Sequence, residues 1–269
     1  MNRIAWIGLS LLATSAIGCS DDDPAGTGGT GGSGASSSGT PGSGGSGEGG
    51  AATGGSGTTG GAGASGSECT NALEEALGPI DEVSDDDVVP GALVEGAREI
   101  YIDATAGGFQ AAAMNPAVYV KLGDGTKVAV TDPASLSSTD WDLAFKRYVV
   151  RSNSGDGGPG NAAAAFLNNK DFAAATLADA QAAMLEQEIW FDENCDYELD
   201  ATNGLVTTFS SWFMYEGMVL TPQPGTWVVR GADRTSLYKL ELLTYYADPD
   251  GGEEPTVGAR FRVKVAALQ

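Results

Sequence analysis

Residues 20–67 limit the fold more than any other part of this 269-residue sequence. They consist almost entirely of Gly, Ser, Thr and Ala after an acidic start, and they contain no aromatic residue and no Leu, Ile or Val. Such a segment cannot bury a core, so we expect a disordered linker with an r.m.s. span on the order of 35 to 40 Å. Residues 68–269 must build the fold, and about 200 residues are enough for a single domain.

The first 18 residues have the organisation of a secretory signal. Arg3 gives a positive start, an apolar run follows from Ile4 to Leu12, and small residues precede Cys19. This run is shorter than the roughly 20 apolar residues that a membrane-spanning helix needs. Residues 15–19 resemble a bacterial lipobox, which implies that Cys19 carries lipid such as palmitate and that residues 1–18 are removed. The alternative is an ordinary cleaved signal followed by an unmodified cysteine.

If Cys19 is lipidated, residues 19–67 tether the domain to the cell envelope. Ser20, rather than Asp, follows the cysteine, and by resemblance to well-studied bacteria this favours the outer membrane. The formal net charge is −22, which argues against binding to nucleic acid or to anionic lipid, since both attract basic surfaces. We therefore expect contact with the membrane only through the anchor.

The chain contains no histidine. Its absence removes the Ser-His-Asp and Cys-His catalytic arrangements, the usual general base near neutral pH and the His-rich zinc sites. Paired carboxylates could still serve a glycosidase, but 36 acidic residues make such pairs uninformative. The sequence therefore favours a protein that is not an enzyme.

Thr139–Asn153 has the clearest strand pattern in the chain. Large apolar side chains alternate with small or polar ones from Trp141 to Phe145, which predicts a half-buried strand with Trp141 and Phe145 on the same face. The pattern changes at Arg147, where we expect a bulge or bend. Residues 153–160 include four glycines and a proline, which indicates a flexible loop.

Further strand patterns precede and follow this segment. Val, Leu, Tyr and Phe are frequent in each, and Gly123-Asp124-Gly125 indicates a hairpin turn between two of them. The sequence predicts a mainly β, antiparallel-rich domain with one or two short helices. The predicted strands are 99–103, 117–122, 126–130, 189–191, 205–209, 212 onward, 226–230, 236–246 and 257–266.

Two segments interrupt the strand patterns. Leu177–Gln187 is rich in Ala, Leu, Gln and Glu, and Thr176 with Asp179 has the spacing of a capping box, so we expect a short helix. Met184 falls on its apolar face and is expected to be buried. A second, weaker helix pattern lies within residues 70–80.

Cys69 and Cys195 remain once Cys19 is assigned to the lipid. In an exported chain the two are expected to form a disulfide. It would close a loop of about 125 residues and stabilise the fold by about 3 to 5 kcal/mol in the chain-entropy model. Two separate thiols are the alternative.

Two motifs in the central segment resemble a known family. W-D-L-A-F at Trp141–Phe145 and R-S-N-S-G at Arg151–Gly155 are similar to the signature of the HmuY-like haem-binding lipoproteins. Weaker similarity extends to Trp212–Arg230 and to the pair Tyr245 and Tyr246. The resemblance implies an all-β domain that holds haem in a cleft with two axial side chains, and it makes an outer-membrane receptor or another surface protein a candidate partner.

The best-known relatives use histidine ligands, which this chain lacks. The resemblance implies methionine ligation instead, because a thioether is a sound haem ligand. The candidates are Met218, Met214 and, as a first ligand, Met114, with Met218 falling in the family's second ligand region. An even spacing would place Met214, Met218 and Trp212 on one strand face. Tyr215 is a further candidate. The alternative for Met214, Met218 and Trp212 is ordinary packing in the core or at an interface.

Arginine side chains are the candidates for meeting the two haem propionates. Arg147, Arg151 and Arg230 lie in or beside the family-like segments. Two functions therefore stay open. The first is a lipid-anchored protein that binds haem or a related porphyrin, and the second is a protein of the same fold that binds no haem and acts as a structural or interaction module.

Overall fold

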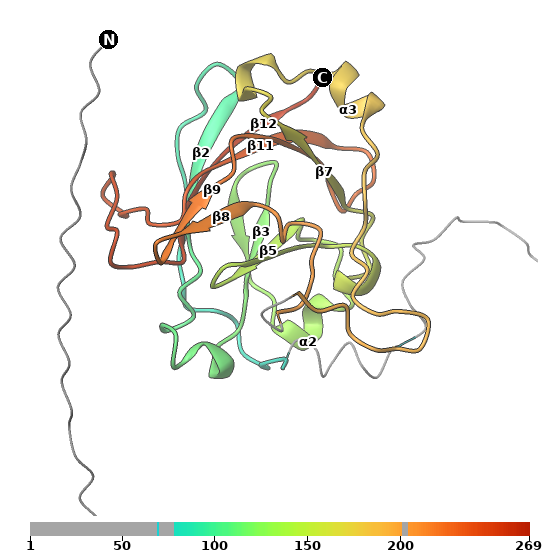
Figure 1. The fold of residues 1–269 in the computed structure, drawn as a ribbon, viewed down its shortest axis with the longest axis vertical. Helices are drawn as coiled ribbons and strands as arrows, with labels where there is room; N and C mark the ends of the chain where they lie inside the picture. The colour runs from blue at the N-terminus through green and yellow to red at the C-terminus, as the bar shows by residue number, and fades with distance from the viewer. Residues whose placement is uncertain (1–68, 70–77, 201–203) are drawn as a thin grey trace, which may run out of the picture. The chain divides into compact units, whose positions relative to one another are not determined.

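The computed structural model describes Cys69, residues 78–200 and residues 204–269 (Figure 1). These residues form a mainly β structure with antiparallel sheets and short helices, as the sequence predicts. Most of the predicted helix in residues 70–80, together with the signal, the linker and Cys19, lies outside the described residues. No helix in the described part is both long and apolar enough to cross a membrane.

The larger sheet has six antiparallel strands in the order β1-β2-β12-β11-β10-β7. In β11 and β12 buried residues alternate with partly exposed ones, so each strand turns one face towards the core. Tyr238, Leu240 and Leu242 of β11 face the core, whereas Lys239 and Glu241 do not. The six strands are β1 (Val88–Pro90), β2 (Ala97–Asp103), β7 (Ala163–Asn168), β10 (Gly225–Arg230), β11 (Leu237–Thr244) and β12 (Arg260–Ala267).

The smaller sheet has four antiparallel strands in the order β4-β3-β5-β6. Figure 1 shows the larger sheet lying across it. Both sheets contribute to one core, which includes Ile100 and Ile102 from β2 and Leu143 and Phe145 from β5. The four strands are β3 (Val118–Lys121), β4 (Thr126–Val128), β5 (Leu143–Lys146) and β6 (Val149–Ser152).

The central segment differs from its prediction in three ways. It is not one bent strand, because Arg147 and Tyr148 form a turn between β5 and β6, with Arg147 at a φ of 54°. Trp141 precedes the strand and packs with Ala144, while Phe145 faces the main core. Consequently both sides of β5 are covered, and the half-buried prediction is wrong.

A third, two-stranded sheet is formed by β8 (Phe213–Glu216) and β9 (Val219–Pro222). Gly217 and Met218 form its turn, both with positive φ. The prediction that Met214 and Met218 share one strand face is therefore wrong, since the chain reverses between them. The predicted strands at 189–191 and 205–209 are also wrong, because only isolated bridges at Phe191 and Leu205 form there.

The helices are all short. α3 (Leu177–Ala182) has the predicted capping box between Thr176 and Asp179. It ends at Ala183, whose backbone is extended, so Met184 lies beyond the helix and is 86% exposed instead of buried. The remaining helices are α2 (Asp132–Ser135), η1 (Ala112–Met114), η2 (Gly155–Gly157) and η3 (Phe172–Ala174).

The structure contains the disulfide that the sequence analysis expects. Cys69 and Cys195 are joined, with 5.5 Å between their Cα atoms. Cys69 packs with Trp190 and Phe191 in a small cluster separate from the main core. The bond therefore connects the start of the domain to the segment that follows α3.

Candidate functional site

The two signature motifs form one buried network. Asp142 forms an ion pair with Lys121 at 3.2 Å and accepts backbone hydrogen bonds from Leu122 and Ala232. Asn153 donates to the carbonyl oxygens of Ser138 and Trp141. These contacts hold the end of the smaller sheet to a loop of the larger one, so the motifs stabilise the fold.

Arg151 lies at the centre of this network and is only 4% exposed. Its guanidinium carbon is 4.9 Å from the centroid of the Trp141 ring, 5.3 Å from that of Tyr119 and 5.9 Å from that of Trp190. One terminal nitrogen donates to the Gly157 carbonyl, and the other donates to the Tyr119 hydroxyl at 2.7 Å. Cation–π contacts of this kind are strongest when both partners are removed from water.

Glu188 is a buried carboxylate that joins three segments. Its Oε1 accepts from the backbone N–H of Ser152 at 2.7 Å, and its Oε2 accepts from Trp190 Nε1 and from the backbone N–H of Thr208, both at 2.9 Å. Burial raises the pKa of Glu188, and the hydrogen bonds act in the opposite direction. This role could not be predicted from the sequence, since one acid among 36 carries no distinguishing pattern.

Most of the loop of residues 153–160 is buried, with Gly155 partly exposed and Pro159 exposed, so it is not the flexible loop that its glycines predicted. Gly155 has a φ of 50°, and a Cβ atom there would collide with the backbone oxygen of Glu188. Its glycines therefore allow close packing. The signature region is enclosed except where Ala144, Phe145 and Arg151 line a cavity of about 190 Å³, which is too small for a porphyrin.

The predicted methionine ligands lie elsewhere, on the β8–β9 hairpin. We define the hairpin surface as the exposed side chains of Met214, Tyr215, Met218 and Val219. Met218 at the turn is 83% exposed, while Met214 is 39% exposed. Successive side chains of a strand point to opposite faces, so Met214 and Tyr215 lie on different sides of the hairpin.

The hairpin packs beside the turn between β5 and β6. Trp212 Nε1 donates to the Tyr148 carbonyl at 2.9 Å, and the Tyr148 and Phe213 rings meet edge-on at 6.1 Å. The hydroxyl of Tyr246 accepts from the backbone N–H of Leu220. Trp212 itself is buried in the main core, so it belongs to the packing and not to the exposed surface.

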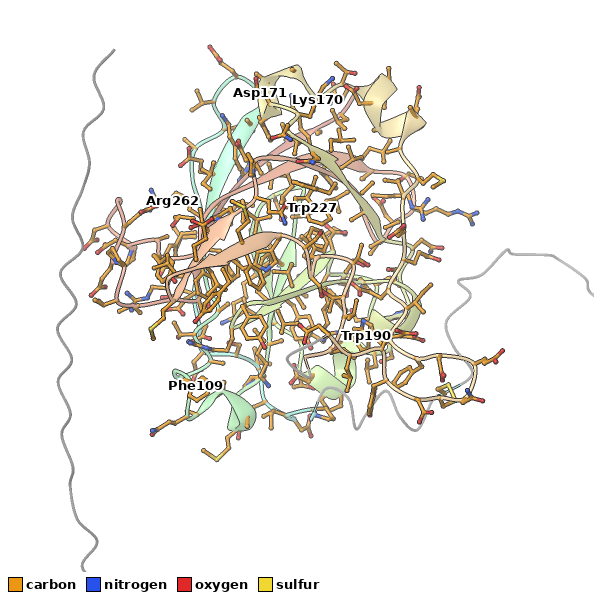
Figure 2. All side chains as sticks on the ribbon, in the orientation of Figure 1. Phe109, Lys170, Asp171, Trp190, Trp227 and Arg262 are labelled. Carbon is orange, nitrogen blue, oxygen red and sulfur yellow. A yellow bond between two sulfur atoms is a disulfide. The ribbon has the colours of Figure 1, made fainter. Side chains whose placement is uncertain are left out.

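The loop that precedes β3 reaches the same turn from another part of the chain. The backbone N–H of Arg147 donates to Ala104, and its guanidinium donates to the Thr105 carbonyl at 3.4 Å. This loop carries Met114, 70% exposed, and Phe109, which is also exposed and is labelled in Figure 2. The turn at Arg147 is thus contacted both by the loop of Met114 and by the hairpin.

The three candidate arginines occupy different places. Arg147 lies at this turn beside Tyr148, whereas Arg151 is enclosed in the signature network. Arg230 lies at the last residue of β10 and donates to the Asn161 carbonyl, just before β7 begins. Of the three, only Arg147 is next to the hairpin.

The described residues contain no cluster of three or more His, Cys, Asp or Glu side chains that could hold a metal ion. At the hairpin the side-chain donors are the sulfur atoms of Met214 and Met218, the phenol oxygen of Tyr215 and the exposed carboxylate of Glu216. Tyr148 and Phe109 could not be identified as exposed from the sequence, because the exposure of an aromatic side chain is known only from the structure.

Comparison with protein families agrees with the signature motifs. Residues 114–257 match the family model described as HmuY protein. A search of curated proteins found no match. The matched segment covers more than half of the chain and includes the signature network, the turn at Arg147 and the whole hairpin, and the chain therefore belongs to the HmuY family.

Proposed function

We propose that this protein binds haem or a related porphyrin at the hairpin surface and does not act as an enzyme. The observation that carries the proposal is the pair of exposed thioethers, Met214 and Met218, on a hairpin inside the segment that matches the HmuY family. Exposed methionine at a turn contributes little to folding, so a role in binding gives it a reason to be there.

The donor set fits a haem whose iron is held by sulfur. A thioether is soft and neutral, and it is an established axial ligand that favours the ferrous state. Met218 is the first candidate because it is the most exposed methionine of the hairpin, and Met214 is the second. Met114, exposed on the loop whose first residues, Ala104 and Thr105, contact Arg147, is the candidate for the first ligand.

The neighbouring groups support the same placement. Tyr148 and Tyr215 are exposed aromatic rings that a flat macrocycle can cover, on the side of the hairpin opposite Met214, and Arg147 can pair with a propionate there. This side favours Met218 over Met214 as the ligand. The cavities nearby are too small to enclose a porphyrin, since the one beside Tyr148 and Phe213 has about 30 Å³ and drug-sized ligands need roughly 300 Å³ or more. Haem would therefore rest on an open surface.

We also propose that the protein is exported and anchored through lipid on Cys19, with residues 19–67 as the linker and residues 68–269 as the binding domain. The lipobox-like residues before Cys19 support this part. An outer-membrane location would place the domain where it could pass haem to a receptor or to another surface protein.

A haem titration of the full-length protein in detergent tests the proposal. The expected result is a saturable shift of the Soret band, larger for reduced than for oxidised haem. The Met184→Ala variant is the matched control, because Met184 is as exposed as Met218 but follows α3 instead of lying on the hairpin. A titration with no saturable shift in either redox state would overturn it.

The second candidate function is a module that binds another protein and no haem. The same exposed apolar side chains favour it, because such surfaces also mark protein interfaces. The absence of histidine is the feature that most supports this alternative. This alternative becomes the better explanation if two results occur together. The wild type shows no saturable haem binding, and it binds an envelope protein that the hairpin variants do not bind.

A further inference from the structure

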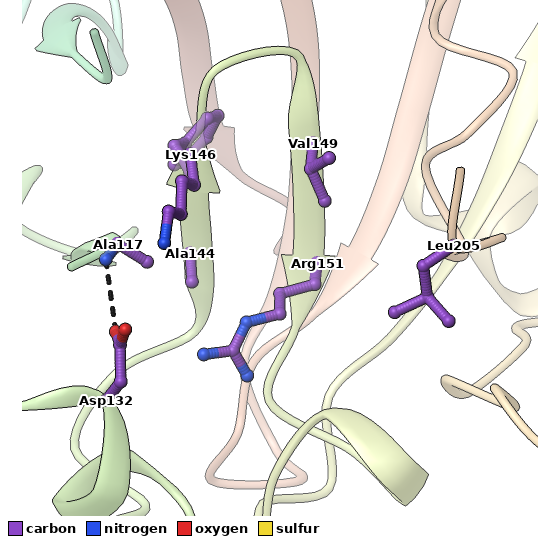
Figure 3. Close-up of a pocket in the computed structure, with 8 residues that line it drawn as sticks. Ala117, Asp132, Ala144, Lys146, Val149, Arg151 and Leu205 are labelled. Atoms are coloured by element: carbon purple, nitrogen blue, oxygen red, sulfur yellow. Dashed lines mark hydrogen bonds between the residues drawn. The ribbon is translucent and has the colours of Figure 1, made fainter. Parts of the chain in front are cut away.

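A separate cavity of about 190 Å³ opens on the side of the smaller sheet that faces away from the main core. Figure 3 shows its lining side chains, which come from β5, from β6, from Ala117 next to β3, from Asp132 of α2 and from the segment at Leu205. None of the methionines considered above lines it. The lining residues are Ala117, Asp132, Ala144, Phe145, Lys146, Val149, Arg151 and Leu205.

The walls of the cavity are mainly apolar. Ala117, Ala144, Val149 and Leu205 present only hydrocarbon side chains to it. A cavity of about 150 Å³ with similar walls is known to hold one benzene molecule. The volume here therefore suits a ligand with a single small ring or a short branched chain, and it is too small for a macrocycle.

Two cations face this apolar space. Lys146 and Arg151 both line the cavity, and neither takes part in any ion pair formed among the described residues. Arg151 instead donates to neutral acceptors, namely Gly157, Tyr119 and Ser135. A buried cation without a carboxylate partner is unusual, because desolvation of a charge is costly unless an opposite charge is near.

The one acid in the lining is already satisfied. Asp132 Oδ1 accepts from the backbone N–H of Ala117 at 3.0 Å and from the Tyr119 hydroxyl at 2.7 Å, while its Oδ2 accepts from the backbone N–H of Ile80. Burial raises the pKa of Tyr119 to about 12, so the phenol keeps its proton. It can therefore donate to Asp132 while it accepts from Arg151.

The charges of the lining add to one net positive charge, from two cations and one carboxylate, in a chain whose net charge is −22. Burial lowers the pKa of Lys146, and Arg151 acts in the same direction while Asp132 opposes it. A bound anion next to the amine would stabilise its charged form, and so would oppose the effects of burial and of Arg151 on the pKa of Lys146. The site thus lacks one negative charge.

We infer that this cavity binds a small monocarboxylate with an apolar body, of about the size of benzoate. The carboxylate would lie between Lys146 and Arg151, and the ring or branched chain would contact Ala144, Val149 and Leu205. The inference does not depend on haem binding, because no hairpin methionine lines this cavity.

Calorimetric titration of the full-length protein with benzoate tests this site. Saturable binding is expected, and benzyl alcohol, which has a similar shape but no charge, should bind roughly tenfold more weakly or worse because charge-assisted hydrogen bonds are lost. In NMR spectra of the same sample, benzoate should raise the pKa of Lys146. Equal binding of benzyl alcohol, or no saturable benzoate binding, would overturn the inference.

Variants locate the binding. Lys146→Met should weaken benzoate binding roughly tenfold or more, and Val149→Phe should abolish it by filling the space. Lys264→Met is the matched control, since Lys264 is on β12 of the other sheet, and Met218→Ala should also bind benzoate normally. Thermal unfolding of each variant separates loss of the site from loss of the fold, and normal benzoate binding by folded Val149→Phe would contradict the assignment.

Discussion

The guanidinium of Arg151 lies over the indole ring of Trp141, 4.9 Å from its centroid, and both side chains are buried. The two residues belong to the two signature motifs, which lie side by side at the open end of the β5–β6 hairpin, where Leu143 pairs with Ser152 and Ala144 with Arg151. Their contact explains why the motifs occur together. It also means that a sequence match to this signature reports the fold of the family and says little about the ligand.

The first prediction concerns this contact. Arg151→Lys should lower the free energy of unfolding by roughly 2 to 5 kcal/mol, because lysine cannot stack on three rings while donating to Gly157 and Tyr119. Chemical denaturation measures the change. Arg230→Lys is the control, since Arg230 makes a single hydrogen bond to Asn161, and an equal effect of both variants would contradict the role given to Arg151.

Most of the fold could be predicted because hydrophobic alternation is local. β11 and β12 show it directly, and the capping box of α3 is a pattern of four consecutive residues, from Thr176 to Asp179. Met184 was misplaced because nothing in its sequence shows that the helix ends at Ala183. Met218 was misplaced although Gly217 gives a turn signal directly before it.

The candidate site could be predicted only in part. The methionine ligands stay a prediction from residue chemistry and from the family, whereas the pairing of Lys146 with Arg151 in one cavity depends on the β5–β6 turn. Glu188 was missed for a related reason. Its donors come from Ser152, Trp190 and Thr208, and contacts between distant segments leave no periodic pattern.

The second prediction is about Glu188. Glu188→Gln should destabilise the fold by roughly 2 to 5 kcal/mol, because an amide NH₂ group would replace one of the two acceptor oxygens and face donors instead. Denaturation of the variant measures the loss. Glu186→Gln, two residues earlier and more exposed, is the control. Unchanged stability of Glu188→Gln would show that the network is not needed.

The third prediction is the pH dependence of the same residue. The pKa of Glu188 in the folded state is above its ordinary value of 4.5 because of burial. Folding therefore favours the protonated form of Glu188. The contribution of this proton to the free energy of unfolding is complete below pH 4.5, and it is lost as the pH rises through the pKa of Glu188 in the folded state. The stability of the wild type minus that of Glu188→Gln should fall across this window. A difference that stays constant or rises with pH would contradict the shift.

The fourth prediction concerns the disulfide. Cys69 and Cys195 are 126 residues apart, so reduction should cost roughly 3 to 5 kcal/mol in the chain-entropy model. Comparing Cys195→Ser with the wild type by denaturation measures this. Protein exported to an oxidising compartment should resist alkylation at both positions until a reductant is added. Two thiols that react without reductant in the folded protein would refute the pairing.

The fifth prediction concerns the anchor. If lipid is attached to the Cys19 thiol as proposed, Cys19→Ser should move the protein from the membrane fraction to the soluble fraction. Fractionation of the producing cells measures the distribution. Ser20→Ala changes the neighbouring residue and keeps the thiol, so it should stay with the membrane, and membrane association of Cys19→Ser equal to that of the wild type would refute the anchor.

If haem binds at the hairpin surface, the redox state of the iron and the identity of the methionine should both matter. Met218→Ala should weaken binding of reduced haem by at least roughly tenfold, because it removes an axial ligand, whereas Met184→Ala should change neither affinity nor stability since its side chain is 86% exposed and remote from the hairpin in sequence. Absorption spectra of the two variants during haem titration provide the comparison. Equal affinity in both redox states, with spectra unchanged by Met214→Ala and Met218→Ala, would remove these methionines from the site.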